Sequence, residues 1–312
     1  MVNLKGIFPA ITTPFDERGE VALEHLRANM EKYNATGIAG YVVLGSTGEA
    51  VMLTPEESDQ VLAAAAKAAG RNKVLIAGTG AESTAEAIAR TNRAADLGYH
   101  AALVRTPHYY KALMTPDVQA EHFQRVADAA RIPVILYSVP QFTGIAIEAP
   151  LVAILSQHQN IIGIKESSGD VRRATDIIAA AHGSFQTMVG SAGTLYASLQ
   201  AGAVGAVLAL ACVFSEKCVE LSDLARRSKA QRALAAQKQL LDSAAVLVTR
   251  LGIPGLKFGM DEVGLLGGLA RRPFLPLTEA QKNDVREAVR AAQAPISGEV
   301  RAGDVRALGR SL

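Results

Sequence analysis

Short apolar segments recur along the whole chain, each bounded by Gly, Pro or Thr. Eight of them stand out, namely GIFPAIT from Gly6, GYVVLG from Gly40, KVLIAGTG from Lys73, AALVRTP from Ala101, PVILYSVP from Pro133, IIGIKES from Ile161, FQTMVGS from Phe185 and GAVGAVLAL from Gly202. Short apolar runs between turn residues are typical of strands. Because these runs are almost uninterrupted, both faces of each predicted strand are expected to be buried.

The segments between these strands are rich in Ala, Glu, Lys, Arg and Leu, which favour helix. Three of them begin with helix start signals, at Thr54-Pro55-Glu56-Glu57, Ser83-Thr84-Ala85-Glu86 and Thr115-Pro116-Asp117. Eight strand–helix repeats predict an α/β fold, a closed (β/α)₈ TIM barrel over residues 1–210. An open, doubly wound sheet is the alternative.

The remainder of the chain has a helical pattern without strands. Residues 211–296 are predicted to form a C-terminal helical layer, clearest at Val219 to Arg250 and Thr278 to Ala294, because these segments are too long to close a barrel. Residues 297–312 are rich in Gly and Arg and are predicted to be a loosely held tail.

Composition excludes several classes of function. The net charge of +2, from 32 basic and 30 acidic side chains, predicts binding to neither nucleic acid nor an anionic membrane. The apolar run from Ala201 to Phe214 is too short to cross a bilayer, and we expect no signal peptide. Cys212 and Cys218 suggest no disulfide framework, so a reducing, cytoplasmic location is expected.

Lys165 is the residue least suited to its predicted surroundings. It follows Ile161-Ile162-Gly163-Ile164 in a strand expected to be buried, where lysine is rare unless it is paired or functional. Burial favours the neutral amine, which can attack a carbonyl and form a Schiff base. A structural pair of Lys165 with Glu166, or a lysine that extends to the barrel rim, is left open by the residues alone.

Other polar residues lie where the predicted strands end. Tyr137 ends strand five and can transfer a proton if it is hydrogen-bonded into a relay, or else it packs at the rim. Tyr109 and Tyr110 follow strand four and could cover the mouth or contact another subunit. The Gly-rich turns GSTGE, GTGAE and GSAGT follow strands two, three and seven. They could form an anion-binding rim, or serve only as tight turns.

Several familiar catalytic motifs are missing from the sequence. The six His residues form no HExxH and share no ligand spacing, so no catalytic metal is expected. There is no GxSxG and no GxGxxG after a strand, which disfavours a serine hydrolase and a nicotinamide enzyme.

Three motifs carry a resemblance to a known family. Gly45-Ser46-Thr47-Gly48-Glu49, Tyr137-Ser138-Val139-Pro140 and the segment from Ile164 to Asp170 lie in order on predicted strands two, five and six. Together they resemble the dihydrodipicolinate synthase and N-acetylneuraminate lyase family of class I, pyruvate-handling aldolases, from about Gly6 to Glu287. The resemblance implies that Lys165 forms a Schiff base with a 2-oxo acid, without a metal or organic cofactor.

The same resemblance assigns roles to further residues. It implies that Tyr137 is the proton shuttle, linked through the Ser46 hydroxyl to Tyr109 from a neighbouring subunit of a homodimer or homotetramer. It also implies that the Ser46-Thr47 turn holds the substrate carboxylate, and that Gly190 belongs to the substrate site.

Within the family, two positions distinguish possible substrates. The synthase that condenses pyruvate with aspartate semialdehyde typically has an Arg where this chain has Phe142, and a phenyl ring cannot grip a carboxylate as a guanidinium does. The chain resembles more the 4-hydroxy-2-oxoglutarate aldolase branch, in its Tyr-Ser-Val-Pro, in Gly-Ser-Ala-Gly at 190–193 and in Ser167, which that branch places near a second carboxylate. Thr47 departs from that branch, which more often has Asn.

The sequence hypothesis is therefore the retro-aldol cleavage of 4-hydroxy-2-oxoglutarate to pyruvate and glyoxylate. The alternatives are the dihydrodipicolinate synthase reaction, another pyruvate-dependent aldolase or dehydratase, and a 2-oxo acid binding protein without turnover. A binding protein needs no proton relay, so the combination of Lys165, Tyr137, Ser46 and Tyr109 favours an enzyme.

Overall fold

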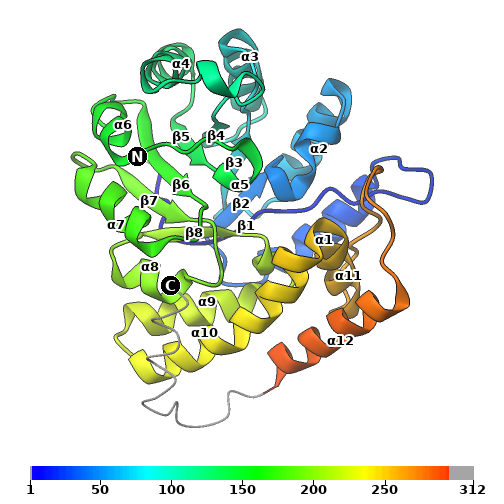
Figure 1. Ribbon diagram of the computed structural model, residues 1–312. Helices are drawn as coiled ribbons and strands as arrows, with labels where there is room; N and C mark the ends of the chain where they lie inside the picture. The colour runs from blue at the N-terminus through cyan, green and yellow to red at the C-terminus, as the bar shows by residue number, and fades with distance from the viewer. Residues whose placement is uncertain (1, 295–312) are drawn as a thin grey trace.

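Eight parallel strands close into a barrel in the computed structural model, which describes residues 2–294 (Figure 1). The strands are β1 (Gly6–Pro9), β2 (Gly40–Val43), β3 (Val74–Gly78), β4 (Ala101–Arg105), β5 (Val134–Ser138), β6 (Ile161–Glu166), β7 (Gln186–Val189) and β8 (Gly205–Leu208). The sheet order is β1-β8-β7-β6-β5-β4-β3-β2. Between β1 and β2, the Ala39 N–H donates to the Ile7 carbonyl at 2.8 Å and Ala10 pairs with Val42. This closure confirms the predicted TIM barrel and excludes the open sheet.

A ring of helices surrounds the strands. It comprises α1 (Leu23–Asn34), α2 (Pro55–Ala68), α3 (Thr84–Asp96), α4 (Pro116–Ala129), α6 (Ala149–Leu155), α7 (Val171–Ala180), α8 (Leu195–Gln200) and α9 (Ser215–Arg226). The predicted start signals are confirmed, since Thr54, Ser83 and Thr115 accept hydrogen bonds from the backbone of the first turns of α2, α3 and α4. A further short helix, α5 (Pro140–Thr143), follows β5.

The C-terminal helices lie together on one side of the barrel (Figure 1). They are α10 (Ala230–Ala244), α11 (Gly252–Glu262) and α12 (Glu279–Gln293), with a π-helical segment, Ala245–Arg250, between α10 and α11. The segment from Val219 to Arg250, predicted to be helical, is divided among α9, α10 and the π-helical segment. Ser228 adopts a left-handed backbone with φ of 55°, which ends α9 before α10 begins.

This break also changes the place of α9 in the fold. α9 packs against β1 and α8, so it completes the outer ring, although its sequence had been assigned to the added layer. The predicted tail, 297–312, lies outside the described residues.

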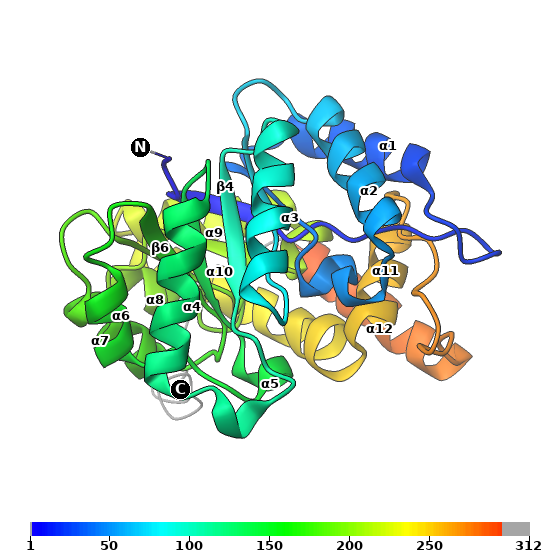
Figure 2. The same ribbon diagram turned by 90° about the horizontal axis from the view of Figure 1, so that it is seen from above.

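Apolar side chains fill the barrel and leave its open end for polar groups. Phe8, Ile76, Leu103, Ile135 and Met188 are all fully buried in the interior cluster, which agrees with strands buried on both faces. α5 follows the carboxyl end of β5 and lies at the opposite end of the barrel from the N-terminus (Figure 2). In the part of the chain that the structure describes, no helix is both long and apolar enough to cross a bilayer.

Candidate active site

Lys165 and Tyr137 lie side by side at the carboxyl end of the barrel interior. The two residues are register partners on β6 and β5, and each side chain is 5% exposed. The Lys165 Nζ lies 4.2 Å from the centroid of the Tyr137 ring. The structure therefore brings these two predicted residues together, at the end of the barrel where enzymes of this fold place their chemistry.

Ser46, in the turn after β2, contacts the Tyr137 member of this pair. Its Oγ lies 3.2 Å from the Tyr137 hydroxyl, and either atom could donate the hydrogen bond. Ser46 and Thr47 are half-buried in a 3₁₀ turn, Ser46–Gly48. Among residues 2–294, the structure gives no acceptor for the backbone N–H of either residue. The turn thus offers N–H donors and hydroxyls beside the Tyr137–Lys165 pair.

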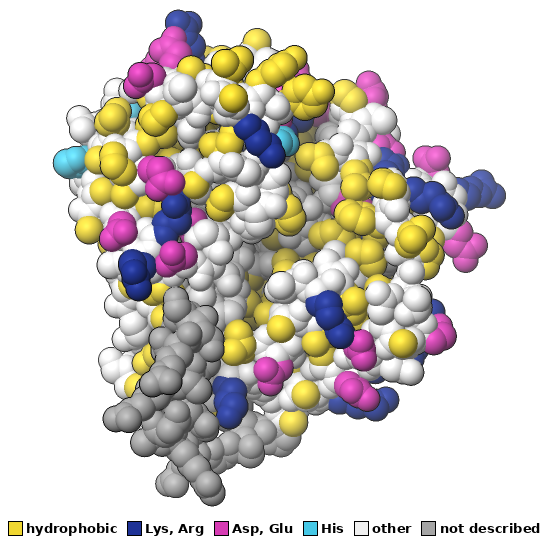
Figure 3. Space-filling model, in the orientation of Figure 1, with side chains coloured by type: hydrophobic (Ala, Val, Ile, Leu, Met, Phe, Trp, Pro, Cys, Tyr) yellow, Lys and Arg dark blue, Asp and Glu magenta, His cyan; other side chains and the backbone are white. Residues whose placement is uncertain are grey.

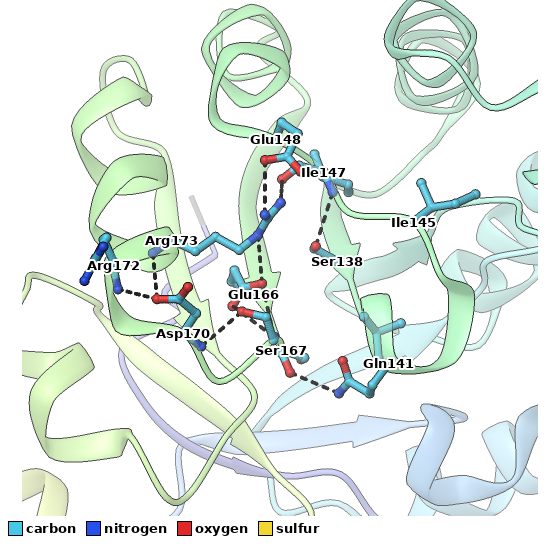
Figure 4. Close-up of polar contacts among 12 residues, drawn as sticks. Ser138, Gln141, Ile145, Ile147, Glu148, Glu166, Ser167, Asp170, Arg172 and Arg173 are labelled. Atoms are coloured by element: carbon cyan, nitrogen blue, oxygen red, sulfur yellow. Dashed lines mark hydrogen bonds and ion pairs between the residues drawn. The ribbon is translucent and has the colours of Figure 1, made fainter. Parts of the chain in front are cut away.

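Glu166 does not pair with Lys165, because successive residues of a strand point to opposite faces. Its carboxylate points toward Arg173 instead (Figure 4). Its Oε2 accepts hydrogen bonds from the Ser168 N–H at 3.0 Å and the Ser168 hydroxyl at 2.8 Å. Arg173 lies 3.4 Å from Oε1 and extends on to Glu148. Burial raises the pKa of Glu166, against the opposing effect of the Ser168 hydrogen bonds and the Arg173 charge. Within the described chain Lys165 has no ion-pair partner, so the structural alternative is not observed.

A cavity of about 610 Å³ lies at the carboxyl ends of β6, β7 and β8, and its lining does not include Lys165, Tyr137 or Ser46. Ser167, Gly190 and Phe142 line it, as does Gln141, which sequence reasoning did not single out. The outer wall comes from α10 and the π-helical segment. Its described lining contains no charged side chain. The same face of the molecule is hollowed near its centre (Figure 3).

Two polar residues of this cavity, Gln141 and Ser167, are in contact with each other. The Gln141 side-chain amide donates to the Ser167 carbonyl at 3.0 Å, as Figure 4 shows. The Ser167 Oγ is buried and has no hydrogen-bond partner among the described residues, so it is free to bind a ligand. Phe142 is 66% exposed on α5, at the rim of the cavity. No signal in the sequence could place the distant α10 residues on this wall, because only tertiary packing brings them there.

Tyr109 is not brought to Ser46 or Tyr137 within the chain. Its side chain is 77% exposed and stacks edge to face on Tyr110, with ring centroids 5.1 Å apart. Its backbone is held firmly, since Glu82 accepts hydrogen bonds from the N–H groups of His108 and Tyr109 at 2.8 and 2.9 Å. The GTGAE turn therefore supports the Tyr109 loop and is absent from the cavity lining, unlike the turn at 190–194.

The described residues contain no group of three or more His, Cys, Asp or Glu side chains that could hold a metal ion. Cys212 and Cys218 are buried free thiols. The candidate site is thus a buried amine beside a phenol and a hydroxyl, next in sequence to a cavity whose described lining carries no charge and begins on this strand at Ser167.

Comparisons with known proteins agree with this fold. The model of the dihydrodipicolinate synthetase family matches residues 3–292. A 4-hydroxy-tetrahydrodipicolinate synthase from Xanthomonas campestris is 38% identical over 282 residues, which cover 90% of this chain and 92% of the relative. A dihydrodipicolinate synthase from Bacillus anthracis superposes with a TM-score of 0.90 at 27% identity, over 95% of this chain and 100% of that one.

A second solved structure links the fold to a ligand. The dihydrodipicolinate synthase from Acinetobacter baumannii, solved in complex with pyruvate, has a TM-score of 0.88 and 32% identity over 93% of this chain and 99% of its own. The family match spans almost all of the chain, including β5 and β6 with Tyr137 and Lys165 and the turn after β2 with Ser46. This chain belongs to the dihydrodipicolinate synthetase family, whose members are metal-independent lyases that bind pyruvate through a lysine Schiff base.

Proposed function

We propose that this protein makes or breaks a carbon–carbon bond between pyruvate and an aldehyde, with Lys165 as the Schiff-base lysine. The observation that carries the proposal is a buried Lys165 that has no carboxylate partner among residues 2–294 and lies against a Tyr137 whose hydroxyl is bonded to Ser46. A lysine amine at the open end of the barrel, which no described carboxylate binds, is suited to nucleophilic attack on a ketone. The adjoining phenol is suited to proton transfer.

The reaction can be written with these groups alone. The Lys165 amine attacks C2 of pyruvate, and loss of water gives an iminium ion. A C3 proton leaves through Tyr137 and Ser46, and the resulting enamine attacks the aldehyde carbon while Tyr137 protonates the aldehyde oxygen. Water then adds to the iminium, releasing the product and restoring the amine. The reverse order cleaves a 4-hydroxy-2-oxo acid, and the imine itself withdraws the electrons.

The turn after β2 is proposed to hold the carboxylate of the 2-oxo acid. The backbone N–H groups and hydroxyls of Ser46 and Thr47 are the donors, and they lie beside Tyr137. Ser167, Gly190 and Phe142, which line the neighbouring cavity, would contact the aldehyde portion.

Different observations support two candidate reactions, which differ in the aldehyde that is joined to pyruvate or released with it. The names of the curated relatives support 4-hydroxy-tetrahydrodipicolinate synthase activity, with aspartate semialdehyde as the partner of pyruvate. This candidate is better supported than the aldolase hypothesis drawn from the sequence. Cleavage of 4-hydroxy-2-oxoglutarate is kept as the second candidate because Phe142, at the cavity rim, supplies no guanidinium and the free Ser167 Oγ faces the cavity.

A second copy of the chain is proposed to complete the site. Tyr109 and Tyr110 are exposed apolar rings on a loop whose backbone is held in place, as a contact between subunits requires. The proposed assembly is a homodimer or homotetramer in which Tyr109 reaches the neighbouring Ser46. A cytoplasmic location, expected from the two free cysteines, is part of the same proposal.

Borohydride reduction in the presence of pyruvate tests the central claim. The expected result is a covalent pyruvyl adduct on Lys165, located by peptide mass spectrometry and absent from the Lys165→Ala variant. A parent protein without an adduct would refute the Schiff base. Turnover of pyruvate with aspartate semialdehyde, compared with pyruvate release from 4-hydroxy-2-oxoglutarate, then separates the two candidates.

A further inference from the structure

The turn that is proposed to hold the substrate carboxylate has an unfavourable backbone at both ends. Leu44, before it, has φ of 59°, and Glu49, directly after it, has φ of 54°. Neither residue is Gly, so each pays a steric cost in the left-handed region. Such conformations persist only where the surrounding structure holds them. The groups that hold this turn therefore help to determine the shape of the carboxylate site.

Lys257, on α11 of the C-terminal layer, contacts two residues that adjoin the turn, Glu49 and Thr13. Its Nζ forms an ion pair with Glu49 Oε1 at 2.5 Å. The same Nζ donates to the carbonyl of Thr13 at 2.6 Å, and the Thr13 hydroxyl donates to the Gly48 carbonyl at 2.7 Å. The Lys257 ammonium group thus binds Glu49, which follows the turn, and Thr13, which in turn binds Gly48, the last residue of the turn.

These contacts are made out of reach of water. Lys257 is 1% exposed and Glu49 is 2% exposed. The Lys257 Nζ also donates to the Leu269 carbonyl at 2.7 Å, and Glu49 Oε2 accepts from the Arg271 N–H at 2.8 Å. Hydrogen bonds to a charged group are stronger than neutral ones, and a buried charge is tolerated because it is paired.

The neighbouring charges have partners of their own. Arg271, whose backbone N–H bonds to Glu49, directs its guanidinium to Glu57 at 2.5 Å. Asp261, on the same helix as Lys257, accepts from the Gly267 N–H at 2.7 Å. Burial lowers the pKa of Lys257 to about 8, and the Glu49 carboxylate opposes that shift. Glu49 is therefore the direct counter-charge of Lys257.

We propose that Lys257 is a positioning residue, which acts through Glu49 and Thr13 to keep the Ser46–Gly48 turn in the shape that binds the carboxylate of the 2-oxo acid. This inference rests on the proposed Schiff-base function. It gives the C-terminal helical layer a part in substrate binding, although Lys257 touches no substrate.

The test measures the pyruvate concentration that gives half-maximal borohydride trapping on Lys165. Lys257→Met should raise that concentration about 10- to 100-fold, the equivalent of one lost charged hydrogen bond. The control is Lys73→Met, since Lys73 is also buried and also donates to two carbonyls, those of Thr36 and Ile38, but precedes β3 at the other end of the barrel. It should lower the unfolding midpoint and leave the pyruvate dependence unchanged.

A double variant separates positioning from stability. Lys257→Met alone leaves the Glu49 carboxylate buried without its ion-pair partner. Adding Glu49→Gln removes that charge and keeps an acceptor for the Arg271 N–H, so the unfolding midpoint of the double variant should recover toward the parent value. Its half-maximal pyruvate concentration should stay raised. Recovery of both quantities, or an unchanged pyruvate dependence in the folded single variant, would overturn the inference. A parent protein that forms no adduct would overturn the proposed function and this inference together.

Discussion

The close approach of Gly190 to Ser167 makes Gly190→Ala a direct test of the geometry at the cavity. A Cβ added at Gly190 would lie 2.0 Å from the Ser167 Oγ and 2.7 Å from its Cβ. Non-bonded carbon atoms prefer about 3.5 to 4.0 Å, so the methyl group cannot fit without movement. The Gly190 N–H also donates to the Glu166 carbonyl at 2.7 Å, which ties the ends of β6 and β7 together.

The expected cost follows from these two contacts. Overpacking of this kind costs about 1 to 3 kcal/mol. If the strand ends separate, the lost hydrogen bond adds about 1 kcal/mol, so the free energy of unfolding should fall by about 2 to 4 kcal/mol. Ser167 lies two residues after Lys165 on the same side of the chain, and a displacement of about 1 Å at a reacting group can lower turnover about 100-fold.

Urea unfolding and steady-state turnover measure both effects. Gly45→Ala is the matched control, because a Cβ there would meet only the Val42 Cγ1 at 3.6 Å and φ is −75°. Ser167→Gly combined with Gly190→Ala removes both clashing atoms and should recover most of the lost stability, without recovering the contacts of the Ser167 hydroxyl. A Gly190→Ala protein with the stability and turnover of the parent would refute the reasoning.

Three further changes test other parts of the site and fold. Tyr137→Phe removes the hydroxyl bonded to Ser46 and should lower turnover about 100-fold or more in a pyruvate-release assay, and a parent-like rate would contradict the proton relay. Phe142→Arg, at an exposed position, should raise kcat/KM for aspartate semialdehyde about 10-fold or more over the parent, since a guanidinium binds a carboxylate. Phe142→Leu is the control, and equal kcat/KM values in the three proteins would show that this position does not select the aldehyde. Burial lowers the pKa of His122 to about 4 from 6.5, so between these values the unfolded chain binds a proton that the folded chain excludes. The free energy of unfolding should therefore be fully retained above pH 6.5 and fall by about 3 kcal/mol as the pH drops to 4. His122→Gln, which can still bond to the Thr84 hydroxyl, should show a flatter pH profile, and a parallel one would argue against this assignment.

The parts of the fold that local patterns determine were predictable. Each strand is a continuous apolar run, and Thr54 bonds to its own first helical turn, so both features lie within a few residues of sequence. The break after α9 was missed because Ser228 carries no Gly or Pro signal for its left-handed backbone. The π-helical segment, Ala245–Arg250, also has no local signal, since its sequence is that of an ordinary helix.

The site divides in the same way. Lys165 and Tyr137 stood out because a polar group at the end of an apolar strand must face the barrel mouth. The roles of Gln141, Lys257 and the α10 wall depend on contacts between residues far apart in the chain, which no local pattern contains. Tyr109 lies away from Ser46 and Tyr137 within the chain for a different reason, because its proposed partner is the Ser46 of a second copy of the chain.

Successive side chains of β6 point to opposite faces of the strand, which explains how Glu166 can directly follow Lys165 in sequence without forming an ion pair with it. Lys165 faces the interior beside Tyr137, whereas Glu166 faces the helices, where Ser168 and Arg173 bind its carboxylate. A carboxylate bound to the Lys165 Nζ would occupy the atom that is proposed to attack the ketone. Because successive residues of a strand point to opposite faces, one strand supplies both the proposed nucleophile, on the inside, and a buried acid on the outside that fixes the backbone at Ser168. The reactivity proposed for Lys165 therefore depends on the register of β6 as much as on the lysine itself.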